Sequence, residues 1–284
     1  MKTTAIRTRK PEAVDRESRE LRLLLDAIFE RYGIDFRAYA YSSLKRRVLR
    51  CVLQEELQTI SDLRTRVLTD PEAMDRLQTA LTIHVTAMFR DPDFYRVFRD
   101  KVVAALKTYP FVRIWVAGCS TGEEVYSLAI LLHEEDLYQR CRIYATDISD
   151  KILNRAKAGI FPLSAMQEYT ANYQAARGHY SFAEYYTADN EHAILRPFLR
   201  ENVIFAAHNL AGDASFNEFH VIFCRNVMIY FDPHLQERVH GLFHDSLTMY
   251  GYLGLGRSET LRFSSWESSY EIISKKERLY RKIK

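Results

Sequence analysis

Hydrophobic residues recur along the chain at two different spacings, and the change comes close to residue 110. Before that point they recur every three or four residues, which is typical of helices that pack by one face. The first such run is Leu21, Leu24, Leu25, Ile28, Phe29 and Tyr32, and it is followed by Gly33, where a helix can end. The same spacing predicts helices over 43–57 and 60–68. Asp-Pro pairs at 70–71 and 91–92 predict the starts of two more.

After residue 110, short β-branched and aromatic runs alternate with helical segments, which is typical of a mostly parallel sheet with helices on both faces. The expected strands are 112–117, 142–146, 203–207, 221–224 and 252–255, followed by a closing hairpin at 270–274 and 279–282. The alternation breaks between Gly159 and Arg200. There, 164–177 has helical spacing, and 181–187 with 193–196 predicts a small β-hairpin. We interpret about 164–200 as an insertion.

The chain thus divides into a flexible tail (1–15), a helical N-terminal domain (16–90), a linker helix (91–110) and an α/β domain (111–284). Its 284 residues, 47% of them hydrophobic, suffice for two domains with cores. A net charge of +3 is too small to imply nucleic-acid binding by the whole chain. Neither a secretion signal nor a membrane-spanning run is present, and the four scattered cysteines favour a reducing compartment, so we expect a cytoplasmic protein.

The strand at 112–117 turns through Gly118 into a helix, a pattern that by itself is weak support for ligand binding. Ser120 and Thr121 are each followed three residues later by a glutamate, which predicts a capping box. The adjacent carboxylates of Glu123 and Glu124 would repel a pyrophosphate, whereas the ammonium and sulfonium of S-adenosylmethionine meet no such penalty. The alternative is that both glutamates only cap the helix.

Polar residues follow the other expected strands. Asp147 ends the second strand, where a carboxylate can accept both hydroxyls of a ribose; its alternative role is to cap the next helix. Asn209, Arg225 and Asn226 come just after the third and fourth strands and could bind an adenine, although each alone could be a turn residue. Because the carboxyl ends of parallel strands share one edge, we expect these residues to line one crevice.

Two further segments offer candidate chemistry. Thr86 and Arg90 lie one helical turn apart where the two halves of the chain meet, which makes them candidates for a cleft. The alternative for Arg90 is a surface ion pair with Asp91 or Asp93, of little energetic value. A helical pair, His240 and His244, lacks the glutamate of a zinc-protease motif, so we expect no metal.

A basic run lies between residues 37 and 50, with no acidic residue in it. It consists of Arg37, Lys45, Arg46, Arg47 and Arg50. Such a run is most often a solvated helix face, but it could equally dock an acidic protein or an RNA backbone. The charge alone does not choose between these partners.

Four segments, LTIHVTAMFRDP, WVAGCSTGEEVYSLAI, YATDIS and FCRNVMIYFDP, occur in this order, and from about residue 20 onward the chain resembles the chemotaxis receptor methyltransferase (CheR) family. The resemblance implies a Rossmann-like α/β methyltransferase domain with a small β-subdomain insertion, preceded by an all-α N-terminal domain. It implies transfer of a methyl group from S-adenosylmethionine to glutamate side chains of membrane chemoreceptors, giving glutamate methyl esters and S-adenosylhomocysteine.

The resemblance also implies site residues. Cofactor contacts are expected from His84, Thr86, Arg90, Gly118, Glu124, Asp147, Asn209, Leu210, Arg225 and Asn226. Arg90 and Tyr230 are expected to face the methyl group and the acceptor as catalytic residues, and the family often has asparagine at the position of His84. The basic helix is expected to bind the cytoplasmic methylation region of the receptor through Lys45, Arg46, Arg47 and Arg50.

Some CheR members hold a receptor's C-terminal pentapeptide through a glycine-rich loop of the β-subdomain. Here the loop at 187–192 is short and has no glycine, so we expect no dependence on that tether. A glutamate acceptor is already ionised at neutral pH, so positioning rather than a general base should suffice. We expect a monomer with neither nucleic-acid partner nor membrane insertion. The alternatives are an RNA methyltransferase and a non-catalytic S-adenosylmethionine-binding scaffold, and a nicotinamide dehydrogenase is the least supported.

Overall fold

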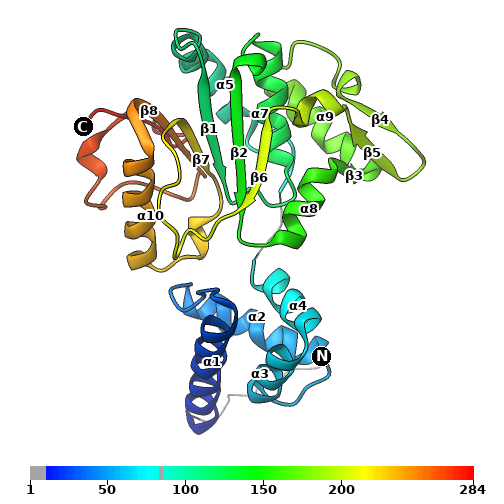
Figure 1. Cartoon of the computed structure of the whole chain (residues 1–284), viewed down its shortest axis with the longest axis vertical. Coiled ribbons are helices and arrows are strands. Elements are labelled where there is room, and N and C mark those ends of the chain that lie inside the picture. Colours follow the sequence, from blue (N-terminus) through cyan, green and yellow to red (C-terminus); the bar gives the residue numbers. More distant parts are fainter. Residues whose placement is uncertain (1–10, 83–85) are drawn as a thin grey trace, which may run out of the picture. The chain divides into compact units, whose positions relative to one another are not determined.

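The computed structural model describes residues 11–82 and 86–284, and the chain divides into two compact units, Met1–Ile83 and His84–Lys284 (Figure 1). Most of the tail expected at 1–15 lies outside the described residues. Helix α1 already begins at Pro11, so the helical region starts earlier than predicted.

The first unit consists of helices α1 (Pro11–Tyr32), α2 (Tyr41–Gln54), α3 (Ile60–Thr69) and α4 (Pro71–Leu81). The apolar faces seen in the sequence are buried together; Leu21, Leu24 and Ile28 of α1 are 0% exposed. Helix α4 starts as its sequence predicts, because Asp70 accepts the N–H of Glu72 and a proline occupies the first turn. The predicted helices of this unit are confirmed.

The segment after residue 85 differs from the expected linker helix. Helices α5 (Pro92–Lys101) and α6 (Val103–Leu106) belong to the second unit, as do residues 86–91. Phe94 and Phe98 of α5 are 0% exposed, and their ring centroids lie 5.0 and 5.1 Å from that of Phe223 in the sheet. The helical domain therefore ends before residue 84 rather than at 90, because the apolar face of α5 is part of the other core.

The second unit is built on a seven-stranded sheet in the order β6-β2-β1-β7-β8-β10-β9 (Figure 1). Its strands are β1 (Val112–Ala117), β2 (Cys141–Asp147), β6 (Val203–Ala207), β7 (Phe219–Cys224), β8 (Leu247–Leu255), β9 (Tyr270–Ser274) and β10 (Leu279–Lys282). The first five are parallel to one another, and β10 pairs antiparallel with both β8 and β9. This confirms the Rossmann-like α/β fold.

The strand order reverses beside β1. The chain runs from β1 through β2 to β6 on one side and then crosses to β7 and β8 on the other. In open α/β sheets, ligands bind at the carboxyl edge of such a switch point. Helices α7 (Glu123–Glu134), α8 (Asp150–Ala158) and α10 (Pro233–Ser246) connect these strands, and most of α7 is buried.

The insertion holds a second sheet of three antiparallel strands in the order β3-β5-β4. Its elements are β3 (Ile160–Pro162), α9 (Met166–Ala175), β4 (Tyr186–Ala188) and β5 (His192–Leu195). The predicted hairpin is confirmed as β4 and β5, but its first part is the 3-10 helix Phe182–Tyr185. The insertion also begins earlier than about 164, because β3, too short for a visible alternation, pairs with β5.

Glu134, at the end of α7, connects the insertion to the main core by hydrogen bonds and an ion pair. Its carboxylate accepts hydrogen bonds from the hydroxyls of Tyr173 and Tyr185 and pairs with Arg99 at 2.6 Å. Among the helices that the structure describes, none combines the length and the hydropathy needed to cross a bilayer.

Candidate functional site

The loops that follow the parallel strands meet at the carboxyl edge of the sheet. Asp147, at the end of β2, accepts the N–H of Ser120 from the loop after β1 at 3.0 Å, and its carbonyl accepts the N–H of His208, just past β6, at 3.1 Å. These two hydrogen bonds join the loops after β1 and β6 to the end of β2, across 27 or more residues of sequence. They confirm that the strand ends form one edge.

The turn after β1 requires glycine at Gly118. Its φ is +74°, and a Cβ there would lie 2.5 Å from Val227 Cγ2 in the loop after β7. The predicted capping box is wrong: α7 begins at Glu123 with Gly122, φ +97°, at the N-cap, so neither Ser120 nor Thr121 occupies that position. The reason is the backbone path of this turn, which places a left-handed glycine immediately before the helix.

Asp147 is 8% exposed, and its two carboxylate oxygens accept the N–H groups of Ser120 and Ser149. The cap of α8 is Ser149, whose Oγ accepts the N–H of Ile152. Because another residue takes the capping role, the capping alternative for Asp147 is wrong. Its carboxylate is held by backbone groups at the carboxyl edge of the sheet.

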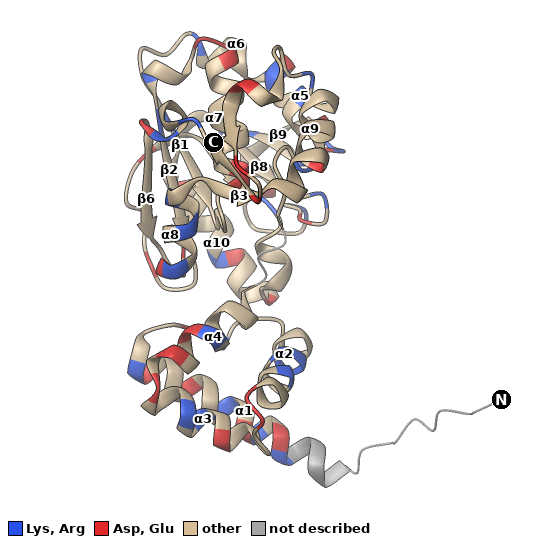
Figure 2. Cartoon of the chain, turned by 90° about the vertical axis from the view of Figure 1, so that its right-hand side faces the viewer, with Lys and Arg blue, Asp and Glu red and all other residues tan. Residues whose placement is uncertain are grey.

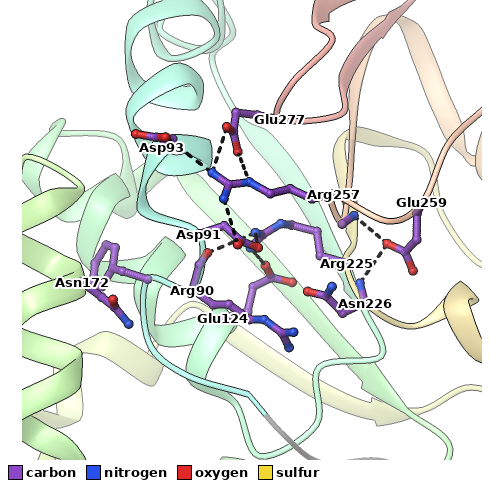
Figure 3. A network of polar contacts seen from close by, with 12 residues as sticks. Arg90, Asp91, Asp93, Glu124, Asn172, Arg225, Asn226, Arg257, Glu259 and Glu277 are labelled. Carbon is purple, nitrogen blue, oxygen red and sulfur yellow. Dashed lines mark hydrogen bonds and ion pairs between the residues drawn. The ribbon is translucent and has the colours of Figure 1, made fainter.

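Arg225 lies at the centre of the site (Figure 3). Its side chain is 3% exposed, and it donates to Glu124 at 2.6 Å, to Asp91 at 2.9 Å and to the carbonyl of Arg90 at 3.1 Å. The guanidinium also sits 4.2 Å from the ring centroid of Phe94. Burial is the largest single effect on the pKa of Arg225 and lowers it, but the charges and hydrogen bonds of its neighbours, Glu124 first, together outweigh burial and raise the pKa. The guanidinium of Arg225 thus pairs with two carboxylates, Glu124 and Asp91.

The ion pairs continue outward from Asp91. Asp91 lies 3.5 Å from Arg257, and Arg257 also pairs with Glu277 at 3.0 Å (Figure 3). Asp93 pairs with Lys276 at 2.7 Å. The carboxylate that precedes α5 is therefore shared between two arginines from the ends of β7 and β8.

Glu259, just after β8, is a site residue that sequence reasoning missed. It is 5% exposed and accepts backbone N–H groups from Asn226, Val227 and Met228 at 2.8 Å each, and from Gly256 at 2.6 Å. These bonds hold the loop that carries Arg225 and Asn226 (Figure 3). No spacing in the sequence signals this role, because three of its four donors are backbone groups 31 to 33 residues away in the chain.

The other expected site residues are placed as follows. Asn209 forms a turn, in which its Oδ1 accepts the N–H of Ala211, and the adjoining Leu210 is 7% exposed. Thr86 and Tyr230 are half-buried, with Tyr230 at the end of the 3-10 helix Met228–Tyr230. His84 lies outside the described residues.

The basic helix α2 lies in the first unit, and its four expected substrate-binding residues differ in their surroundings. Arg47 is 7% exposed and donates to the carbonyl of Leu81, and Lys45 pairs with Glu17 at 3.0 Å. Only Arg46 and Arg50 are exposed. The expectation for Arg47 as a surface contact is wrong, because it satisfies a backbone group inside its own unit.

Two family models match the chain: "CheR methyltransferase, all-alpha domain" over residues 19–82 and "CheR methyltransferase, SAM binding domain" over residues 84–277. The chain belongs to the CheR methyltransferase family. The resemblance read from the four segments is thereby confirmed, and the second unit is the S-adenosylmethionine-binding domain of a CheR methyltransferase. A nicotinamide dehydrogenase is excluded.

Several CheR relatives match over most of their length. A Pseudomonas putida relative named Cher3 is 49% identical over 263 residues, which are 93% of this chain and 96% of the relative. A chemotaxis protein methyltransferase of Listeria innocua is 32% identical over 81% of this chain and 85% of its own length. Chemotaxis protein methyltransferase 1 of Pseudomonas aeruginosa is 31% identical over 76% and 80%.

Proposed function

We propose that this chain methylates glutamate side chains in the cytoplasmic methylation region of membrane chemoreceptors, using S-adenosylmethionine and giving glutamate methyl esters. The observation that carries the proposal is the buried Arg225, which pairs with Glu124 and Asp91 at the switch point of the domain that matches the family model. The relatives named chemotaxis protein methyltransferase support the choice of acceptor.

The residues at the strand edge fit S-adenosylmethionine. Its ammonium and sulfonium suit a crevice edged by the carboxylates of Glu124 and Asp147, and the missing side chain of Gly118 leaves backbone where a larger residue would collide with Val227. We propose that the cofactor is held by Thr86, Arg90, Gly118, Glu124, Asp147, Asn209, Leu210 and Asn226, with His84 as a further candidate. Arg225 holds Glu124 in place; its own side chain is buried.

When bound, S-adenosylmethionine supplies a methyl group whose bond to sulfur breaks as its bond to the glutamate oxygen forms, leaving S-adenosylhomocysteine. The acceptor carboxylate is ionised at neutral pH, so the chain's residues do not need to remove a proton. Arg90 orients a carboxylate, and Tyr230 donates a hydrogen bond near the reacting atoms. Alignment and exclusion of water then supply most of the rate.

The first unit supplies the docking surface in this proposal. Figure 2 shows basic residues along α2, and among them Arg46 and Arg50 are exposed. We propose that these two meet the acidic methylation region of a receptor. Lys45 contributes less because Glu17 already pairs with it.

The loop between β4 and β5 supports methylation without a pentapeptide tether. Asp189 Oδ1 accepts the N–H groups of Glu191 and His192 at 2.8 and 2.7 Å, which closes a tight turn with no glycine. We also propose a monomeric cytoplasmic enzyme that uses no metal. The four cysteines are buried and free, which suits a reducing compartment.

The test is methyl transfer from labelled S-adenosylmethionine to a receptor cytoplasmic fragment and, in parallel, to RNA. We expect label in the receptor fragment that alkali releases as methanol, as an ester requires. Arg90→Ala should abolish the transfer while the fold, measured by circular dichroism, persists. Label in RNA alone, or binding without turnover on either acceptor, would refute the proposal in favour of the RNA methyltransferase or the scaffold.

A further inference from the structure

The backbone around Arg90 has an uncommon conformation. The residues on either side of it, Phe89 and Asp91, have φ of +52° and +56°, in the left-handed region that side chains with a Cβ rarely adopt. Two such residues flanking a third persist only when the surrounding contacts impose the conformation. Segment 88–91 is therefore held in shape by its neighbours.

One set of contacts comes from α7 and the core. The N–H of Phe89 donates to Ser127 Oγ at 2.8 Å, and that hydroxyl donates in turn to the carbonyl of Glu123 at 2.6 Å. The ring of Phe89 is 0% exposed, with centroids 5.0 Å from Tyr95 and 5.2 Å from Tyr173. These contacts fix the first left-handed residue.

A second contact comes from the insertion. Asn172 on α9 donates from Nδ2 to the carbonyl of Met88 at 3.1 Å, and Tyr173, the next residue, packs on Phe89. Figure 3 shows Asn172 reaching from its helix towards the segment that carries Arg90. The insertion thus contacts the segment directly.

A third contact comes from the ends of β7 and β8. Arg225 donates both to the carbonyl of Arg90 and to the carboxylate of Asp91, so one guanidinium fixes two consecutive residues. Arg257 lies 3.5 Å from the other oxygen of Asp91. These bonds fix Asp91, the second left-handed residue. Asn172 thus holds the first residue of segment 88–91, and the two arginines hold the last.

We infer that Asp91 and Asn172 are positioning residues, which hold segment 88–91 in its left-handed conformation and thereby direct the side chain of Arg90. This inference rests on the role proposed above for Arg90. It also gives the insertion a part in methyl transfer, because Asn172 of the insertion holds the segment that carries Arg90 whether or not the insertion binds a partner. In this proposal neither Asp91 nor Asn172 contacts the cofactor or the acceptor.

The chain offers matched controls for both residues. Asp91→Asn and Asp93→Asn each remove a carboxylate 3.5 Å from Arg257, but only Asp91 contacts Arg225. Asn172→Ala and Gln174→Ala each shorten a side chain on α9, and Gln174 is exposed. A general effect of lost charge would change the results for Asp91→Asn and Asp93→Asn equally. A general effect on the stability of α9 would do the same for Asn172→Ala and Gln174→Ala.

The first measurement is hydrogen exchange of peptides covering 86–95 in the four variants, which needs neither cofactor nor acceptor. We expect exchange at least about tenfold faster in Asp91→Asn and Asn172→Ala, and within about twofold of the parent chain in Asp93→Asn and Gln174→Ala. Unchanged exchange in the first two variants overturns the inference, whatever the substrate of the enzyme is.

The second measurement is turnover with a receptor fragment. We expect kcat to fall about tenfold or more in Asp91→Asn and Asn172→Ala with little change in KM, and to stay within about twofold of the parent chain in Asp93→Asn and Gln174→Ala, because only the first two changes release the segment that carries Arg90. A kcat within about twofold of the parent chain in Asp91→Asn and Asn172→Ala overturns the inference. Absent turnover in the parent chain refutes the proposed function instead, and hydrogen exchange still decides whether the segment is held as described.

Discussion

Replacement of Glu259 by glutamine tests whether the loop after β7 depends on one buried carboxylate. Each oxygen of Glu259 accepts two backbone N–H groups: Oε2 from Asn226 and Gly256, and Oε1 from Val227 and Met228. Glutamine has one acceptor oxygen, so two of the four donors would face an amide NH2 group. The substitution changes neither the length nor, to a good approximation, the volume of the side chain.

The expected loss follows from those two donors. A buried N–H left without an acceptor costs about 1–3 kcal/mol, so the pair costs about 2–6 kcal/mol. Part of this is offset, because glutamine does not bring a charge into the interior; burial raises the pKa of Glu259 although four N–H groups favour its ionised form. We expect a net loss of about 3 kcal/mol in the free energy of unfolding.

The protein suits this measurement because its two tryptophans, Trp115 and Trp266, both lie in the second unit. Urea unfolding followed by tryptophan fluorescence therefore reports on the unit that contains Glu259, and the midpoint should fall with little change in slope. Calorimetry should show S-adenosylhomocysteine binding weakened about tenfold or more, because the loop that carries Asn226 loosens.

The matched control is Glu267→Gln. Glu267 is exposed and accepts the N–H of Phe263 at 2.9 Å, a bond that one glutamine oxygen can keep. We expect the free energy of unfolding of Glu267→Gln to stay within about 0.5 kcal/mol of that of the parent chain. The same small change in Glu259→Gln, with unchanged ligand affinity, would refute the reasoning.

Three other results are expected. Arg46→Glu with Arg50→Glu should raise KM for a receptor fragment and leave S-adenosylhomocysteine affinity unchanged; an unchanged KM argues against docking by α2. Gly118→Ala should weaken that affinity, by calorimetry, at least about tenfold, because its Cβ meets Val227 in a left-handed backbone. Burial lowers the pKa of His240 below its usual 6.5, so on acidification the unfolded chain binds the proton first and the free energy of unfolding decreases as the pH falls through about 6.5. The urea midpoint should therefore fall less on acidification in His240→Gln than in the parent chain, and an equal fall contradicts this.

Local pattern was enough to predict much of the fold. The bounds of β1, β6, β9 and β10 agree with the expected strands, because their alternation and the turns around them lie within a few residues. The helices of the first unit follow their apolar spacing and their caps for the same reason. The glycine turn and the residues after each strand were also correctly placed at one edge of the sheet.

The partners of the site residues depended on the tertiary structure. Glu124 looked like a helix cap but pairs with Arg225, 101 residues away, and Arg225 in turn binds Asp91 across 134 residues. No sequence spacing encodes these pairs, because they arise only when the strand order brings the ends of β1 and β7 beside the start of α5.

Burial was likewise decided by packing. Arg47 belongs to a basic run, yet its guanidinium satisfies a backbone carbonyl. Glu259 belongs to a polar loop with no recognisable pattern, yet it accepts four backbone N–H groups. Periodicity reports which face of an element is apolar; which buried polar group meets which partner is set by contacts between distant segments, and only the folded chain supplies those.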